Sequence, residues 1–243
     1  MQEETEYRPK PLVPIGGRPI LWHIMRTYAH FGFREFVLCL GYRGDMIKEY
    51  FINYDTMSDD FTIHLGRQHA ITYESSHDEQ DYHVTLADTG LETMTGGRIK
   101  RVQKYIHEDT FMLAYGDGVS DINIKALLEY HYRHGRCATV TAIHPVSRFG
   151  VLDTDEEGKV LSFAEKPVVN DWVSAGFFVF NRRLFDYLAG DDCVLEQEPL
   201  QRLAREGQLM TYKHEGFFFP MDTYRDYKYL NDLWDRGQTP WIR

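Results

Sequence analysis

Short apolar runs alternate with amphipathic segments along the first 145 residues, and this alternation limits the possible folds more than any other feature. Residues 36–40, 111–115 and 138–143 have the length and composition of buried strands. Between them apolar side chains recur at helical spacing, as in residues 19–31. Helices that join strands over short connections make those strands parallel. The sequence therefore predicts an α/β fold of three layers, with a mostly parallel sheet and helices on both faces.

Residues 146–243 have a different pattern. Two apolar runs flank the polar residues 154–158, which predicts a small β-hairpin. The segments that follow predict a strand at 175–180, helices near 181–188 and 196–206, a strand at 209–214 and a last helix at 223–236. In the first part, the polar residues 66–81 read as a surface loop. With no internal repeat or low-complexity linker, we expect a single domain over residues 1–243.

The composition excludes several classes of protein. The formal net charge is -10, whereas a nucleic-acid-binding surface needs a basic face, so we expect no nucleic-acid partner. No apolar run approaches the length of a membrane span, and the acidic start is unlike a signal peptide. The three cysteines, an odd number without paired spacing, fit a reducing compartment. We therefore expect a cytoplasmic protein without a membrane partner.

Two aspartates have the placement expected of a chemical site. Asp117 directly follows an apolar run, and Asp222 directly precedes an amphipathic stretch. Acidic residues at the ends of buried strands are where an open α/β sheet presents chemistry, and two carboxylates can share a hard cation. Three basic residues, Lys10, Arg98 and Lys166, supply positive charge. This inventory predicts a site that handles phosphate groups with a metal ion.

Each of these residues also has a purely structural interpretation. Asp117 lies in Gly-Asp-Gly, which is good turn chemistry, and Asp222 lies where an N-cap of the last helix is expected. Lys10 precedes a proline and can be a solvated loop lysine. Arg98 near a helix start is unfavourable for the helix dipole, which indicates either an anionic ligand or a salt bridge.

Other polar residues read as structural. His131 and His134 share a helix face and are interpreted as solvated rather than as zinc ligands. Residues 196–198, Glu-Gln-Glu, are interpreted as the acidic first turn of a helix. The pair Glu165–Lys166 can be an exposed pair at a strand end. None of these segments predicts a zinc site.

Several motifs occur in an order that resembles one superfamily. Residues 8–20 are similar to the opening region of the sugar-1-phosphate nucleotidylyltransferases, and residues 116–118, 165–167 and 219–223 are similar to its later motifs. Residues 21–25 and 93–98, with Trp241 near the end, narrow the resemblance to the glucose-1-phosphate cytidylyltransferases. The resemblance covers nearly the whole chain and implies a Rossmann-like nucleotidyltransferase fold.

The resemblance also implies an activity. These enzymes transfer CMP from CTP to glucose 1-phosphate with Mg²⁺, release pyrophosphate, and supply dideoxysugars for surface polysaccharides. It suggests a homo-oligomer. Two alternatives stay open: a uridylyl- or thymidylyltransferase acting on glucose 1-phosphate, and a non-catalytic homologue that binds nucleotide sugars.

The same resemblance implies a role for each site residue. Residues 1–145 would form the nucleotide-binding half, and residues 146–243 the sugar-phosphate-binding half. The two aspartates would hold Mg²⁺. The remaining roles are nucleotide binding by Lys10, Thr93, Arg98 and Gly116, and binding of the sugar phosphate by Glu165 and Lys166, with catalysis assigned to Lys10, Asp117, Lys166 and Asp222.

One part of the family pattern would lie before Met1. The family begins with a strand and a glycine-rich loop, Gly-Gly-x-Gly-Thr-Arg, whose backbone N–H groups wrap the triphosphate. The strand would be central in the sheet. For the sequence as given, we therefore expect unpaired strand edges, weak binding of free CTP and poor catalysis.

Overall fold

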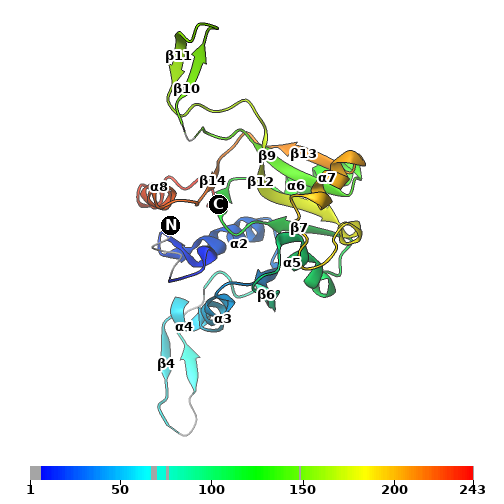
Figure 1. Ribbon diagram of the computed structural model, residues 1–243. Coiled ribbons are helices and arrows are strands. Elements are labelled where there is room, and N and C mark those ends of the chain that lie inside the picture. Colours follow the sequence, from blue (N-terminus) through cyan, green and yellow to red (C-terminus); the bar gives the residue numbers. More distant parts are fainter. Residues whose placement is uncertain (1–6, 67–69, 75–76, 148, 243) are drawn as a thin grey trace.

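A four-stranded sheet forms the centre of the larger part of the molecule (Figure 1). The structure is a computed structural model that describes residues 7–66, 70–74, 77–147 and 149–242. The sheet has the order β13-β9-β12-β7. Its strands are β7 (Thr110–Ala114), β9 (Ala138–Ile143), β12 (Val173–Asn181) and β13 (Leu209–Lys213).

The strand directions make this sheet mixed. β13 pairs with β9 in parallel, whereas β12 is antiparallel to both of its neighbours, β9 and β7. β7, β9 and β13 consequently run in one direction, and β12 runs against them. The predicted α/β class is confirmed, and the reversed β12 is the departure from an all-parallel arrangement. Strands from both parts of the chain, 1–145 and 146–243, share this sheet.

Helices cover both faces of the sheet because alternate residues of β12 point in opposite directions. Phe177 and Val179 belong to one apolar cluster, which contains residues of α2 (Ile20–His30), α6 (Ile124–His134) and α8 (Tyr224–Asp235). Phe178 and Phe180 belong to a second cluster. That cluster contains residues of α5 (Thr95–Arg101), the short 3₁₀ helix η3 (Arg182–Asp186) and α7 (Glu198–Arg205). The predicted three layers are therefore confirmed.

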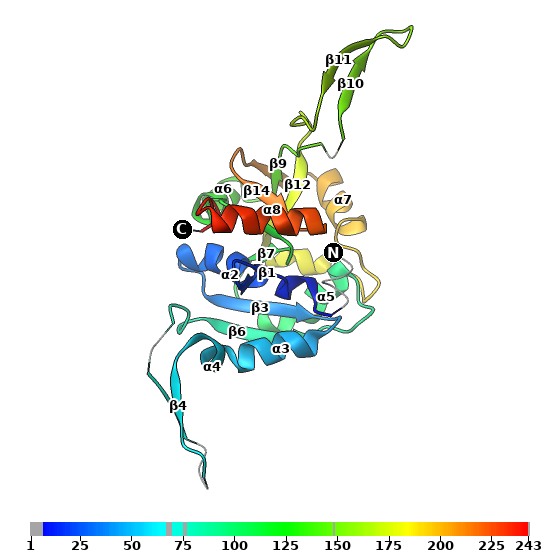
Figure 2. The same cartoon turned by 90° about the vertical axis from the view of Figure 1, so that its left-hand side faces the viewer.

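A second, two-stranded sheet lies beside α3 (Gly44–Ile52) and α4 (Tyr54–Ser58), as Figure 2 shows. It pairs β3 (Glu35–Leu40) with β6 (His83–Asp88) in parallel. Within the described residues, β3 has no strand neighbour besides β6, and β7 has none besides β12. All five residues of β7 are only partly buried, which agrees with a strand at a sheet edge.

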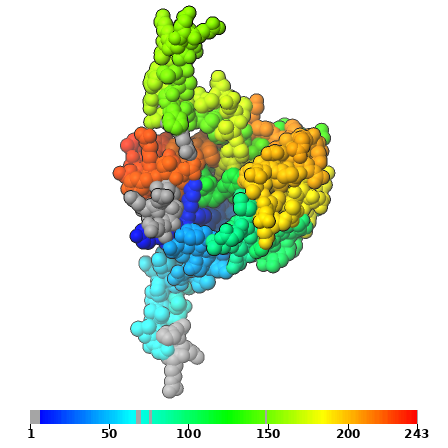
Figure 3. Space-filling view, viewed as in Figure 1, coloured from blue at the N-terminus to red at the C-terminus, as the bar shows by residue number. Residues whose placement is uncertain are grey.

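Two β-hairpins project from opposite ends of the molecule (Figures 1 and 3). One joins β10 (Val151–Thr154) to β11 (Val160–Ala164), which confirms the hairpin predicted around residues 154–158. The other joins β4 (Phe61–Ile63) to β5 (Ile71–Tyr73). The prediction of a loop over residues 66–81 was wrong at β5, and residues 67–69 and 75–76 of that stretch lie outside the described part. Strand pairing with β4 outweighs the polar composition there.

The interpretation of His131 as a solvated residue was wrong. Its side chain is buried, with 3% of the residue exposed, and packs α6 against β9 through Thr139. The Arg136 N–H donates to His134 Nδ1, so His134 Nε2 carries the proton and donates to Thr139 Oγ1 at 2.7 Å. The Thr139 hydroxyl then donates to His131 Nδ1 at 2.8 Å. This chain of bonds requires a neutral His131.

We expect His131 to make the fold sensitive to acid. Burial lowers the pKa of His131 to about 4 from 6.5, and repulsion by the His134 ring, once that ring is protonated, adds to the effect. Between these values the unfolded chain binds a proton that the folded chain does not, so stability falls as the pH drops through this window. His131→Asn should reduce the loss of unfolding free energy between pH 7.5 and pH 5 by about 2 kcal/mol.

Urea unfolding followed by circular dichroism measures this difference. His107→Asn is the matched control, because His107 is exposed. A wild-type loss of stability that persists unchanged in His131→Asn would contradict the assignment. An equal reduction in both variants would also contradict it.

Candidate active site

Strand pairing brings the two predicted aspartates together. β8 (Gly118–Ser120) starts directly after Asp117, and β14 (Phe218–Pro220) ends two residues before Asp222. The strands are antiparallel, with Pro220 opposite Gly118, and the Met221 N–H donates to the Asp117 carbonyl at 2.8 Å. This register places the two carboxylates at the same end of the pair, although they are far apart in sequence.

Lys10 joins the two carboxylates. Its Nζ lies 2.8 Å from Asp117 Oδ2 and 2.8 Å from Asp222 Oδ1. The three side chains are partly exposed, at 29%, 38% and 37% of their surface. Lys10 begins the 3₁₀ helix η1 (Lys10–Leu12) between two prolines, which fix the backbone conformation beside the site. The carboxylates therefore already share one cation, the ammonium group. We call these three residues the Lys10 cluster.

The electrostatics of the cluster favour the charged lysine. Burial alone would lower the pKa of Lys10, but hydrogen bonds and charge interactions with both aspartates raise it above its ordinary value. Lys10 is thus a stable ammonium ion at neutral pH. The two aspartates, which would otherwise repel each other, are held within reach of one small cation.

The last helix does not use Asp222 as its N-cap. Thr223 is the N-cap of α8, and its hydroxyl accepts from the Asp226 N–H in a capping box. The Asp226 carboxylate accepts from the N–H groups of Thr223 and Asp222, at 2.8 and 3.1 Å. The Asp222 carboxylate can therefore point to Lys10: Asp222 lies in the N-cap region as expected, and Thr223 is the cap itself.

Gly116 lies where the chain passes close to η1. A Cβ at this position would be 3.3 Å from Pro11 Cγ, so a larger side chain would crowd the loop that carries Lys10. Thr93 is buried, with 7% exposed, just before α5. The structure thus places Gly116 directly beside η1, which carries Lys10, and Thr93 just before the start of α5.

Arg98 is bound to two backbone carbonyls and a threonine hydroxyl rather than to an acidic residue. Its Nη1 donates to the Leu40 carbonyl at 3.0 Å and to Thr89 Oγ1 at 2.8 Å, and its Nη2 donates to the Leu91 carbonyl at 3.1 Å. A Cβ on Gly41 would lie 2.5 Å from this guanidinium. Arg98 therefore fixes the carboxyl end of β3 and the loop after β6, which neither earlier interpretation foresaw.

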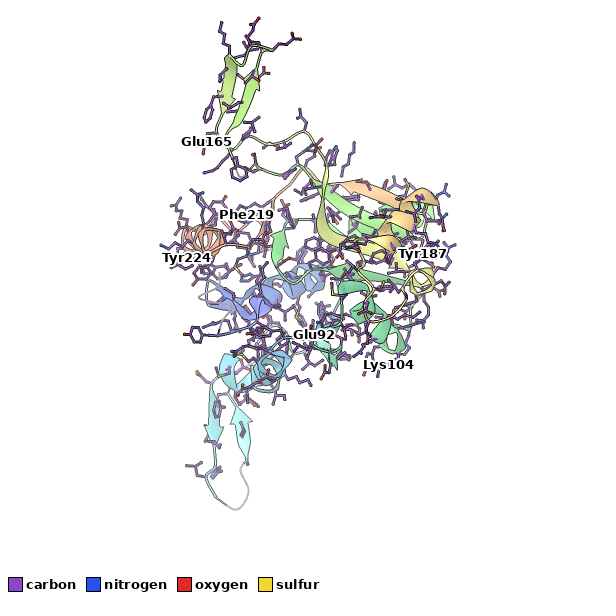
Figure 4. The ribbon with its side chains drawn as sticks, in the orientation of Figure 1. Glu92, Lys104, Glu165, Tyr187, Phe219 and Tyr224 are labelled. Carbon is purple, nitrogen blue, oxygen red and sulfur yellow. The ribbon has the colours of Figure 1, made fainter. Side chains whose placement is uncertain are left out.

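Glu165 and Lys166 lie at the foot of the β10–β11 hairpin, where Figure 4 labels Glu165. Lys166 Nζ lies 3.4 Å from Glu165 Oε1; the Glu165 side chain is exposed, and the Lys166 side chain is partly exposed. Lys166 has a positive φ of 48°, which is uncommon for a residue with a side chain. The structure does not bring this pair into the Lys10 cluster.

Glu196 was missed as a site residue. The acidic first turn expected at residues 196–198 is confirmed for Glu198, whereas Glu196 precedes α7. Its carboxylate accepts hydrogen bonds from Tyr115 OH and, at 2.7 Å, from Thr95 Oγ1. Glu196 therefore links the segment that carries Asp117 to the start of α5. Only the acidic character of this residue was visible in the sequence, because its partners are about 80 and 100 residues away.

In Figure 3 the surface is hollowed next to the blue N-terminal segment, on the side that faces the yellow segment. A separate cavity of about 590 Å³ lies elsewhere and is lined by residues of α2, α3, α4 and β6. None of the predicted site residues lines that cavity. In the described part of the chain, no helix is long and apolar enough to cross a membrane.

The chain matches one family over most of its length. The sequence model of the nucleotidyl transferase family matches residues 5–234. A glucose-1-phosphate cytidylyltransferase of Salmonella typhi is 47% identical over 243 residues, which cover 99% of this chain and 93% of that protein. A probable glucose-1-phosphate cytidylyltransferase of Bacillus subtilis is 42% identical, with 99% of this chain and 94% of that protein covered.

Solved structures share the fold at low sequence identity. HddC from Yersinia pseudotuberculosis complexed with GMP-PN has a TM-score of 0.68 at 19% identity, over 93% of this chain and 90% of that one. An apo-UDP-glucose pyrophosphorylase has a TM-score of 0.68 at 13% identity, over 98% and 94%. These similarities support the fold alone.

The three-layer fold and the family match together define an α/β transferase of the nucleotidyltransferase type. The chain belongs to the nucleotidyl transferase family and, within it, to the glucose-1-phosphate cytidylyltransferases. The recognition made from the ordered motifs is confirmed.

Proposed function

We propose that this chain transfers CMP from CTP to glucose 1-phosphate and gives CDP-glucose and pyrophosphate. The observation that carries the proposal is the Lys10 cluster, in which two carboxylates and an ammonium group meet at 2.8 Å. The relatives at 47% and 42% identity support the choice of nucleotide and sugar through their names. We propose dideoxysugar synthesis for surface polysaccharides as the use of the product.

The reaction needs no nucleophile from the protein. An oxygen of the sugar phosphate forms a bond to the α-phosphorus of CTP, and the bond from that phosphorus to the β-phosphate oxygen breaks. Pyrophosphate leaves with the electron pair. Because both reactants are anions, the protein has to offset their repulsion and hold them in line. Fixed positive charge and a shared metal ion meet this need.

The residues present fit Mg²⁺. Asp117 Oδ2 and Asp222 Oδ1 already lie around one cation, the Lys10 ammonium, and Mg²⁺ is usually bound by one or two carboxylates together with substrate phosphates. When bound, Mg²⁺ would neutralise developing charge on the phosphates. Asp117 and Asp222 would hold it, and Lys10 would pair with nucleotide phosphate oxygens.

The remaining residues divide between the two substrates. Gly116 lies beside η1, where the small residue lets a nucleotide approach the backbone. Thr93 and Arg98 belong to the α5 region, and Arg98 shapes the nucleotide side by fixing the ends of β3 and β6. We assign Glu165 to the sugar hydroxyls and Lys166 to the sugar phosphate, which requires the foot of the β10–β11 hairpin to approach the Lys10 cluster when substrate binds.

The choice of CTP over UTP or dTTP is tested directly. A pyrophosphate-release assay with each nucleoside triphosphate and glucose 1-phosphate compares their turnover. We expect CTP to give the highest kcat/KM. Faster turnover with UTP or dTTP would replace the proposed base, and binding of CDP-glucose without any turnover would favour the non-catalytic alternative.

We also propose that the protein is a homo-oligomer in a reducing, cytoplasmic compartment. Leu152 and Phe163 are directly opposite on the β10–β11 hairpin, and Leu161 is a third apolar residue of β11. These side chains are 54%, 63% and 58% exposed. An isolated two-stranded hairpin is marginally stable in water, so a second copy that buries this face would stabilise it. The free cysteines Cys39, Cys137 and Cys193 fit the compartment.

Phe163→Asp should lower the molar mass measured by light scattering, because it puts a charge into the apolar face of the hairpin. Ser162→Asp is the matched control, since Ser162 points to the opposite face of the same strand. A wild-type mass equal to that of one chain would contradict the oligomer. An equal loss of mass in both variants would contradict the assigned face.

Both aspartates should be needed for turnover. Asp117→Asn or Asp222→Asn should lower kcat by roughly 10²–10³, the size typical of losing one preorganised charge contact. The fold should be little affected, because both carboxylates are partly exposed. Asp153→Asn on the exposed hairpin is the control. Steady-state kinetics measure the effect, and wild-type turnover in either site variant would refute the mechanism.

Lys166→Met should act mainly on the sugar phosphate. Its ammonium group is the nearest assigned partner for that dianion, and charge-assisted bonds are among the stronger ones. We expect a higher KM for glucose 1-phosphate and a lower kcat, with the KM for CTP nearly unchanged. If the KM for CTP changes instead, Lys166 binds the other substrate. Lys159→Met, on the same hairpin, is the control.

A further inference from the structure

The Lys10 ammonium lies at the position that a metal ion shared by the two aspartates would occupy. It is 2.8 Å from one oxygen of Asp117 and 2.8 Å from one oxygen of Asp222. Magnesium-to-oxygen distances are about 2.0–2.1 Å, so small movements of the two side chains would close the carboxylates around the smaller cation. The ammonium and the metal ion therefore compete for the same two oxygens.

The lysine can leave this position without any change of fold. Its backbone is fixed, because the Leu12 N–H donates to the Pro9 carbonyl at 2.8 Å and the Val13 N–H donates to the Lys10 carbonyl at 3.1 Å. Val13 is fully buried and anchors this turn to the core. The lysine side chain, by contrast, is a flexible chain of four carbons and is partly exposed. Only the side chain has to move.

The charges allow one arrangement at a time. With Lys10 in place, the cluster has one positive and two negative charges. A divalent ion added beside the ammonium would meet a like charge within a few ångströms, at a site of reduced dielectric. If Lys10 moves out, the divalent ion and the two carboxylates balance, but the ammonium then needs a new anion. A nucleotide phosphate supplies that anion.

We propose that Lys10 is an internal substitute for the metal ion. Its ammonium group occupies the Asp117–Asp222 pair until a nucleoside triphosphate accepts that ammonium group. A divalent cation then takes its place between the two aspartates. This inference rests on the proposed function, because it uses the same metal site and the same nucleotide. It adds an order of events. Metal alone binds weakly, and metal and nucleotide bind cooperatively through Lys10.

Such an exchange has two consequences. It keeps the two carboxylates paired and close together when no substrate is present, so the site is preorganised. It also couples the two ligands reciprocally: whatever factor the nucleotide adds to metal affinity, the metal adds to nucleotide affinity. Removing the ammonium should abolish most of this coupling and leave the carboxylates available to metal alone.

The test measures binding of Mn²⁺ without nucleotide. Mn²⁺ prefers the same oxygen ligands as Mg²⁺, and its free form is counted by electron paramagnetic resonance. The proteins are wild type, Lys10→Met, Lys125→Met and the double variant Lys10→Met/Asp117→Asn. Lys125 is an exposed lysine of α6, so Lys125→Met controls for the change in net charge.

We expect Lys10→Met to bind Mn²⁺ at least about tenfold more tightly than wild type, a difference equal to one decade in Kd. Lys125→Met should bind as wild type does, and the double variant should lose the gain. Equal affinity in wild type and Lys10→Met would overturn the exchange while leaving the metal site intact. No Mn²⁺ binding to either protein would overturn both the exchange and the metal assignment in the proposed function.

A measurement on the wild type covers the case in which Lys10→Met does not fold. Acetic anhydride reacts with neutral amines, so an ammonium paired with two carboxylates should be acetylated more slowly than Lys125. Mass spectrometry follows both sites as Mg²⁺ is added. We expect the Lys10 rate to rise as Mg²⁺ binds and the Lys125 rate to stay constant. A Lys10 rate that stays unchanged when Mg²⁺ saturates the protein would overturn the proposal.

Discussion

The antiparallel pairing of β8 with β14 is the contact on which the site depends. It joins two segments about a hundred residues apart and sets Pro220 opposite Gly118. Asp117, which precedes β8, and Asp222, which follows β14, therefore lie at the same end of the strand pair. Two carboxylates at this separation repel each other. Lys10 offsets that repulsion with two contacts of 2.8 Å. Strand pairing thus sets the distance between the two carboxylates, and the positive charge of Lys10 stabilises this arrangement.

The larger sheet supports this site through both of its faces. β12 directs alternate aromatic residues into two apolar clusters, one with α2, α6 and α8 and one with α5 and α7. The first cluster includes Val13 and Met221, which directly border the segments of the site. The second holds the segment of Glu196, which contacts Tyr115 beside the site. Both sides of the core therefore fix the position of Asp117.

Local patterns predicted much of the fold because they report on local causes. The alternation of apolar runs and helical spacing gave the layers, and turn chemistry gave the β10–β11 hairpin. The errors have a common origin. β5 forms because it pairs with β4, His131 is buried because Thr139 lies across from it, and Glu196 is recruited by Tyr115. The partner of Glu196 lies 81 residues away, whereas Thr139 lies 8 residues from His131 and β4 precedes β5 in the same hairpin. In each case a contact with another segment, rather than the composition of the segment itself, decides the structure.

By itself the sequence determined the α/β class, the candidate residues and, through ordered motifs, the family. The class and the candidate residues follow from periodicity and residue type within single segments, and the family follows from the resemblance of several motifs in their order. Only the tertiary structure decided which candidates meet. It joined Lys10 to both aspartates, tied Arg98 to backbone carbonyls, and set Lys166 apart at the foot of a hairpin. Distances between remote segments depend on strand register and packing, and both are fixed only when the whole core forms.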